Sequence, residues 1–481
     1  MPILWETVNG VHKLLALLPN VLIRKTYEAG HVTQLHIMLP NPSNTNFGRF
    51  DYYASLVKHL NVFGDGTCYL GIHGWDLLSK RAHAQTLFPN LLSITVQEYF
   101  PEPYSEEQLR QVLDLISPSL VSYWYQQPTI KTFPLRASKT EVMALFDLLI
   151  ERCSIIKRLA IYPGGSQVYR NLPTAFASQP LSHLRELSGS AALVASDLLV
   201  VIGALPRLEY LAIHACDLYL PPLPEELPLA SFPALKRLFF STWYLEDALK
   251  LAQLKPLLCQ LEFLELKLEP HVADEGPGAR KHILALTHTV LSFWLENTVC
   301  LRTLYMNVDP YGNRSEVPDF ARLPKILKRI TELQIQTLHL NGLSINPVIF
   351  HNHLDWSHLK NLHLPDQYVS LWRLCRFAAL PCLEYLKVWL GISDKFAVPD
   401  EIWENRQLRT IESSWPILYS RVFQDVDVVA SMLLKTWPNL LEVRCDESNM
   451  SQTGVRETAC IALNKRIAYM RNEILTNNQC K

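Results

Sequence analysis

The chain has 481 residues, of which 48% are hydrophobic and 19% are charged, and its formal net charge is -1. This composition supports a continuous apolar core and excludes an intrinsically disordered chain. The near-neutral charge argues against a nucleic-acid backbone or an anionic membrane as the partner, because both usually require an excess of basic residues. We therefore expect neither nucleic acid nor membrane among the partners.

The first residues predict a helix. Apolar side chains between residues 3 and 18 follow the three- and four-residue spacing of an amphipathic helix, and Pro19 and Asn20 end the pattern. We predict that residues 1–31 form an N-terminal helical cap. This segment is too polar for a secretory signal peptide, and no apolar run in the chain reaches the roughly 18 residues of a membrane span.

From residue 32 onward the chain repeats one pattern, in which three aliphatic residues are separated first by two variable residues and then by one. The first aliphatic residue of the clearest copies is Leu208, Leu235, Leu261, Leu359 or Leu383. This is the pattern of leucine-rich repeats. Weaker copies extend it to about 15 irregular repeats with a mean step of about 29 residues, at the long end for this class. Their first aliphatic residues are Val32, Thr67 (in place of an aliphatic residue), Leu91, Leu120, Ile156, Leu184, Leu301, Ile335, Leu408 and Leu440.

Each copy predicts a short strand, because side chains alternate between the two faces of a strand and the second and third aliphatic residues then point inward. Helices precede some copies: Ser138 with Glu141, and Ser105 with Gln108, are capping-box patterns at helix starts. One such unit cannot bury its apolar side, but stacked units can. We predict an α/β fold, an irregular leucine-rich-repeat solenoid over residues 32–450, with a curved parallel sheet on the concave face and helices and loops on the convex face.

The end of the chain predicts one more helix. Residues 455–475 form a charged amphipathic stretch, and we expect a C-terminal helical cap over residues 451–481. The ten cysteines are scattered and lack the dense, even spacing of a secreted disulfide scaffold. Several lie at or beside repeat positions, where a free thiol packs as a small apolar group. This usage favours a cytoplasmic or nuclear protein.

No signature of catalysis, metal binding or cofactor binding stands out. The cluster of His351, His353 and Asp355, followed by His358 and His363, has no second group of ligands to complete a tetrahedral site. Phosphate-loop and nucleophile-elbow spacings are absent. We expect no enzyme, no metal and no cofactor.

The exposed face of the predicted sheet carries the candidate protein-binding residues. Aromatic and arginine side chains on such a face are the types that anchor protein interfaces. The alternative is that these aromatic residues pack over the sheet, or that the register is shifted by one and sends them into the core. Two groups stand out, one in the middle of the chain and one near its end: Tyr210, Arg237, Phe239 and Phe263, and Tyr385, Lys387 and Trp389.

The N-terminal residues 4–8 (LWETV) and 11–19 (VHKLLALLP) resemble the segment that follows the F-box in large fungal F-box/leucine-rich-repeat proteins. The resemblance implies a substrate-binding role in an SCF-type cullin ubiquitin ligase, with an unknown substrate protein bound by the repeats. The F-box itself, which binds the Skp linker subunit, would lie before Met1, so the linker is an expected partner only if an upstream F-box exists. The alternative is a leucine-rich-repeat scaffold or regulator unrelated to ubiquitination.

Overall fold

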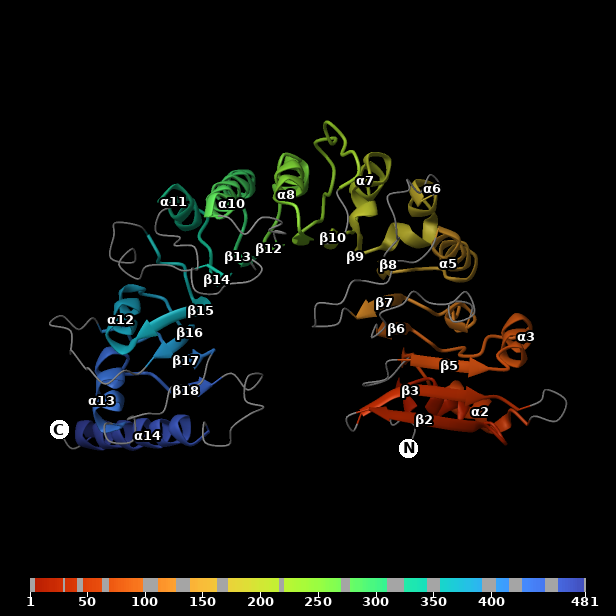
Figure 1. Cartoon of the computed structure of the whole chain (residues 1–481), viewed down its shortest axis with the longest axis horizontal. Helices are drawn as coiled ribbons and strands as arrows, with labels where there is room; N and C mark the ends of the chain where they lie inside the picture. Colours follow the sequence, from red (N-terminus) through yellow and green to blue (C-terminus); the bar gives the residue numbers. More distant parts are fainter. Residues whose placement is uncertain are drawn as a thin grey trace. The chain divides into compact units, whose positions relative to one another are not determined.

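The computed structural model describes residues 5–28, 31–40, 46–62, 69–97, 111–126, 139–161, 172–215, 220–269, 277–308, 324–343, 355–391, 404–414, 426–445 and 457–479. These residues form two compact units, Met1–Leu238 (unit 1) and Phe239–Lys481 (unit 2). Each unit combines strands of a parallel sheet with helices alongside (Figure 1). The prediction of one continuous repeat domain over residues 32–450 stays a prediction.

Within the described residues, the main sheet has 15 strands in the order β1-β4-β6-β7-β8-β9-β10-β11-β12-β13-β14-β15-β16-β17-β18. Their bounds are β1 Thr7–Asn9, β4 His59–Asn61, β6 Ser93–Gln97, β7 Ser122–Gln126, β8 Arg158–Ile161, β9 Glu186–Ser190, β10 Tyr210–Ala215, β11 Arg237–Thr242, β12 Phe263–Leu268, β13 Thr303–Val308, β14 Thr337–Asn341, β15 Asn361–Ser370, β16 Tyr385–Gly391, β17 Thr410–Ser413 and β18 Glu442–Cys445. This parallel sheet with helices alongside confirms the predicted fold class.

The helices of unit 1 are α1 His12–Leu15, α2 Gly48–Ala54, α3 Asp76–Ala84, α5 Lys139–Arg152, α6 Leu172–Phe176 and α7 Ser196–Gly203, with 3-10 turns at Gln179–His183 and Ala191–Val194. Those of unit 2 are α8 Leu245–Ala252, α9 Lys255–Leu258, α10 Pro277–Asn297, α11 Pro324–Glu332, α12 Leu371–Leu374, α13 Val426–Thr436 and α14 Glu457–Gln479, with a 3-10 turn at Cys375–Ala379. In unit 2, α8, α10, α11, α12 and α13 lie on one face of the sheet (Figure 1). None of these five helices lies on the opposite face, which is called the helix-free face below.

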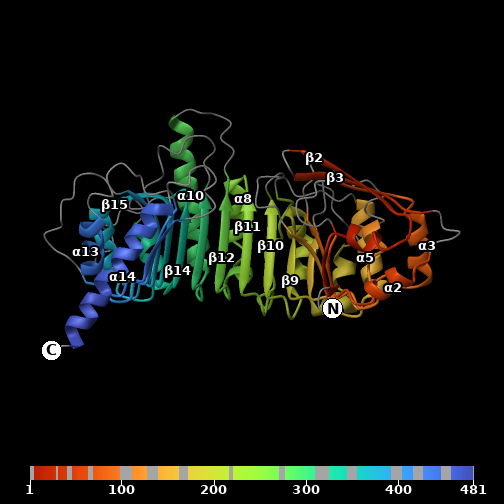
Figure 2. The same cartoon turned by 90° about the horizontal axis from the view of Figure 1, so that it is seen from below.

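The repeat residues form the core because neighbouring strands pair in register. In unit 2, Leu264 is paired with Leu304, and the same register continues through Leu338, Leu362 and Leu386 on the next strands. All five side chains are fully buried. Figure 2 shows β12 and β14 in this sheet, and β13 lies between them in the strand order. A one-residue shift would exchange the two faces, so this burial rules out the alternative register in unit 2.

The first residues of unit 1 differ from the predicted helix. Strand β1 occupies Thr7–Asn9 and pairs in parallel with β4, and the helix α1 is only four residues long. Gly10 lies between β1 and α1 and has a φ of +93°. A right-handed helix cannot continue through a residue with this backbone conformation, so the predicted helix over residues 3–18 is interrupted here. Val8, Val11, Leu14, Leu15 and Leu18 are buried. However, Val8 lies in a strand, and the helical part of the pattern is a single turn.

Two of the faintest repeat copies also lie elsewhere than predicted. Residues 32–37 belong to β3 His31–Met38, and Leu70 and Ile72 belong to β5 Tyr69–His73; these strands are part of a separate three-stranded sheet in the order β2-β3-β5. Strand β2 spans Leu22–Glu28 and is antiparallel to β3. The main sheet instead gains β1 and β4, which are too short and too polar to show the repeat pattern.

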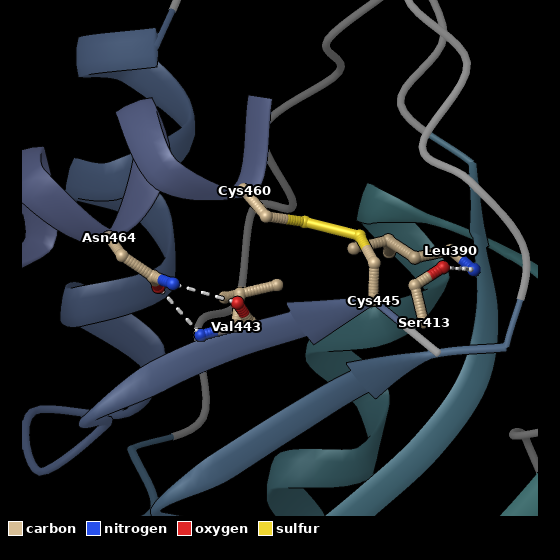
Figure 3. The surroundings of a disulfide bond; sticks show 6 residues. All are labelled: Leu390, Ser413, Val443, Cys445, Cys460 and Asn464. Carbon is tan, nitrogen blue, oxygen red and sulfur yellow. Dashed lines mark hydrogen bonds between the residues drawn. A yellow bond between two sulfur atoms is a disulfide. The ribbon is translucent and has the colours of Figure 1, made fainter. Parts of the chain in front are cut away.

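The helix predicted after Ser138 is α5, and the C-terminal helix is α14. The helix predicted after Ser105 falls largely outside the described residues. Helix α14 packs beside β18, the last strand in the sheet order. The Asn464 side chain accepts a hydrogen bond from the Val443 backbone nitrogen (2.8 Å) and donates one to the Val443 carbonyl (2.9 Å), so it satisfies both backbone polar groups of Val443 at the sheet edge (Figure 3).

A disulfide joins Cys445 at the end of β18 to Cys460 on α14 (Figure 3). This corrects the expectation of free thiols for Cys445, which occupies the third repeat position of its strand. The helix therefore holds the last strand by one covalent bond as well as by the hydrogen bonds of Asn464. Among the described residues, the free cysteines are Cys153, Cys259, Cys300, Cys375 and Cys382.

Candidate protein-binding surface

Alternation along the strands brings one row of side chains to the helix-free face of unit 2. Each member lies midway between the second and third repeat positions of its strand, and pairing aligns these positions across seven strands. Arg444 is exposed and the others are partly exposed, whereas the neighbouring repeat residues are buried except for the intermediate Cys445. The row consists of Glu265, Tyr305, His339, His363, Lys387, Glu412 and Arg444.

Five rings form a continuous stack on this face, which we call the ring ladder. Ring centroids are 5.4 Å apart for Phe263 and Tyr305, 4.9 Å for Tyr305 and His339, 5.2 Å for His339 and His363, and 4.9 Å for His363 and Tyr385. The planes of neighbouring rings differ by only 22° to 33°. Each such contact contributes about 0.5–1.5 kcal/mol beyond simple burial. The ladder is therefore a pre-ordered strip that crosses five strands.

Charged groups close the ladder on its β17 side. The Tyr385 hydroxyl donates a hydrogen bond to Glu412 Oε2 at 2.5 Å, and Lys387 Nζ lies 2.7 Å from Glu412 Oε1. The Lys387 and Glu412 side chains are each only 18% exposed, so water screens the attraction between their opposite charges less than it does at an exposed site. On the next strand Arg444 forms an ion pair with Glu442, which raises the pKa of the exposed guanidinium.

The two histidines of the ladder are neutral at physiological pH. Burial, together with smaller contributions from the nearby His363 and Lys387, lowers the pKa of His339 to about 4. The same burial lowers the pKa of His363 to about 4, with Lys387 adding to the effect and Glu412 opposing it. A neutral imidazole can donate one hydrogen bond and accept another. Nδ1 of His339 is buried and has no hydrogen-bond partner within the described ranges.

A second aromatic pair lies at the carboxyl ends of β15 and β16. The register between these strands shifts between Leu364 and Tyr368, and the irregularity places the Tyr368 ring edge-on to Trp389 at 5.6 Å. Gly391 lies directly beneath the Tyr368 ring, because a Cβ atom there would come within 2.2 Å of it. Tyr368 is 44% exposed, so the pair offers an apolar contact beside the ladder.

The structure distributes the seven predicted binding residues over four places. Phe263, Tyr385 and Lys387 belong to the ladder or its charged end, Trp389 belongs to the second aromatic pair, and Phe239 lies part-buried on β11. Tyr210 and Arg237 lie in unit 1, where the guanidinium carbon is 5.1 Å from the ring centroid. The predicted middle group is thus divided between the two units.

The sequence prediction did not select the centre of the ladder. Tyr305, His339 and His363 stand at the same repeat position as the chosen Lys387, and their shared position was the available signal. Tyr368 carried no such signal, because its place depends on the irregular register of β15.

The described residues contain no group of three or more side chains suited to hold a metal ion. Of the predicted histidine-rich cluster, His351 and His353 lie outside the described residues, Asp355 and His358 are exposed, and His363 is stacked in the ladder. None of the helices in the described ranges combines the length and apolar character that crossing a lipid bilayer requires.

Comparisons with known proteins give little beyond this geometry. No protein-family model matches the chain. No curated protein matches it either. Among solved structures, a chain of the Toll–Spatzle complex of Drosophila has 14% sequence identity and a TM-score of 0.28, over 88% of this chain and 44% of that chain. The chain thus spans less than half the length of that match, and the fold assignment rests on the strand order and register described above.

Proposed function

We propose that this protein is a non-enzymatic recognition module that binds a protein partner on the helix-free face of unit 2. The ring ladder is the observation that carries the proposal. Pre-stacked rings lose little conformational freedom when a partner covers them, which lowers the entropic cost of association. Aromatic side chains in the middle of a partly buried patch are also the residues that dominate binding energy at protein interfaces.

The charge pattern supports a partner that covers the ladder with uncharged groups. Both ladder histidines are neutral near pH 7, and Lys387 and Glu412 are paired with each other. A charged group buried against this strip would lose its hydration without gaining a free counter-charge. Polar uncharged and apolar side chains would instead contact the ring edges and use the hydrogen-bonding atoms of the imidazoles.

A finer proposal concerns the cellular role. Residues 4–8 and 11–19 resemble the segment after the F-box in fungal F-box/leucine-rich-repeat proteins. On that resemblance we propose that the partner is the substrate of an SCF-type cullin ubiquitin ligase, with the Skp linker bound through an upstream F-box in a longer product and with a cytoplasmic or nuclear location. The alternative is a scaffold or regulator with no link to ubiquitination.

The test of the binding face uses the tagged chain and a double variant, Tyr305→Ala with His363→Ala. Proteins captured from the native cells by the unaltered chain are purified, and their affinity for both forms is measured by calorimetry. The control is Phe293→Ala, which removes an aromatic residue that is 38% exposed on α10, on the helix-covered side. A partner that loses at least about tenfold in affinity with the double variant alone supports the proposal. Equal affinity for all three forms contradicts it.

The same capture experiment also tests the proposed role as a ubiquitin-ligase adaptor. Recovery of the Skp linker and a cullin with a longer product that carries an F-box supports the adaptor role. Recovery of a ladder-dependent partner without these subunits, from both products, contradicts the adaptor role and leaves the scaffold alternative.

A further inference from the structure

The three-stranded sheet β2-β3-β5 of unit 1 has an edge that no strand covers in the described part of the chain. Strand β2 is the terminal member of the sheet order, and its strand pairing is with β3. An edge strand presents unpaired N–H and C=O groups to solvent and is a template for pairing with another extended segment. Proteins usually block such edges, so an open one marks a candidate binding site.

One face of this sheet carries an exposed apolar pair. Leu22 on β2 is opposite Met38 on β3, and their exposed fractions are 56% and 44%. The next pair on the same face is Arg24 and His36, and the His36 ring stacks on His73 of β5 at a centroid distance of 6.2 Å. The other face is anchored in the core of unit 1 through Leu35 and Ile37.

Along β2 itself, apolar and basic residues occur in blocks. Leu22 and Ile23 come first, on opposite faces, and Arg24 and Lys25 follow, both exposed. Among the described side chains of β2, β3 and β5, Arg24 and Lys25 are the residues with a permanent charge, and both charges are positive. A strand laid along this edge would therefore meet apolar surface on both faces at one end and positive charge on both faces at the other.

We propose that the open edge of β2 binds an extended peptide segment in which two apolar residues adjoin two acidic ones. The backbone of the segment would continue the sheet, with main-chain hydrogen bonds supplying affinity. Its apolar residues would cover Leu22 and Ile23, and its carboxylates would lie beside Arg24 and Lys25. The site lies in unit 1, so its test is separate from that of the ring ladder.

The test is fluorescence anisotropy with the full chain and a labelled peptide in which two valines adjoin two glutamates between flanking threonines, together with its reversed sequence. One comparison peptide carries lysines in place of the glutamates. A second keeps the side chains but has alternate backbone nitrogens methylated, which removes half of the main-chain donors. The protein variant is Arg24→Glu with Lys25→Glu, and the matched control is Lys80→Glu with Arg207→Glu, two exposed basic residues of unit 1 outside this sheet.

The proposal predicts that one acidic peptide binds, and that affinity falls at least about tenfold for the Arg24/Lys25 variant, the lysine peptide and the methylated peptide, but not for the control variant. Hydrogen exchange of the β2 amides should slow only when the acidic peptide is bound. Equal binding of the lysine or methylated peptide overturns the proposal, and so does the absence of binding. Binding of vesicles of phosphatidylserine and phosphatidylcholine without peptide binding overturns it as well, and assigns the patch to a membrane surface.

Discussion

The two ladder histidines make a specific prediction about acid. Protonating His339 or His363 would place a positive charge in a half-buried stack beside Lys387, which is why burial lowers both pKa values to about 4. In the unfolded chain a histidine titrates near 6.5. Between these values the unfolded state binds more protons than the folded state, so the free energy of unfolding should fall as pH decreases from about 6.5 to 4 and stay constant above that window.

The size of the effect follows from the two pKa values. Each histidine should contribute about 2 kcal/mol less to stability at pH 5 than at pH 7.5. Because His339 and His363 stack on each other, their contributions are not additive, and the pair should cost about 2–4 kcal/mol. His12 of unit 1, whose pKa burial also lowers to about 4, adds a separate term that variants of the ladder leave in place.

The direct assay is a nuclear magnetic resonance titration of the histidine ring carbon–hydrogen signals, assigned with His339→Phe and His363→Phe. Phenylalanine keeps an aromatic ring in the stack and cannot be protonated. Urea denaturation at pH 7.5 and pH 5 should show a smaller difference between the two conditions for the double phenylalanine variant than for the unaltered chain. Ladder signals that titrate near pH 6.5, or an unchanged pH dependence in the double variant, would refute the reasoning.

Three further predictions concern stability. Gly342→Ala should destabilise unit 2 by at least about 2 kcal/mol in urea denaturation. Gly342 has a φ of +70°, and a Cβ atom there would lie 1.7 Å from the Val308 carbonyl oxygen. An unchanged stability would contradict this account. Asn464→Leu should cost about 2 kcal/mol and speed hydrogen exchange at the end of the sheet, because the N–H and the C=O of the buried Val443 each lose the Asn464 side chain as hydrogen-bond partner. Unchanged exchange would count against this account. Replacing Cys445 and Cys460 by serine should cost about 3 kcal/mol in the oxidised protein, and a reductant should produce the same loss in the unaltered chain only; equal stability with and without reductant would argue that the bond does not form in solution.

Much of the main sheet was predictable because the repeat pattern is local. The aliphatic residues of a copy such as Leu264 and Leu266 lie two apart, and alternation along a strand decides that both are buried whatever the neighbouring strand is. The same alternation predicted that Phe263, Tyr385 and Lys387 would lie on the opposite, exposed face. The pattern failed at β1 and β4, where three-residue strands are too short to display a period.

The contacts between strands were decided only by the tertiary structure. Phe263 and Tyr305 become neighbours because β12 and β13 pair in a particular register, although helix α10 separates them in the chain. The disulfide between Cys445 and Cys460 depends likewise on where α14 packs against β18. The sequence by itself determined which side chains face the core and which face solvent, since that choice is made within one strand. The packing of the strands against one another decides which exposed side chains meet to form a surface. The segments that connect the strands differ in length, and no single strand contains the information about this packing.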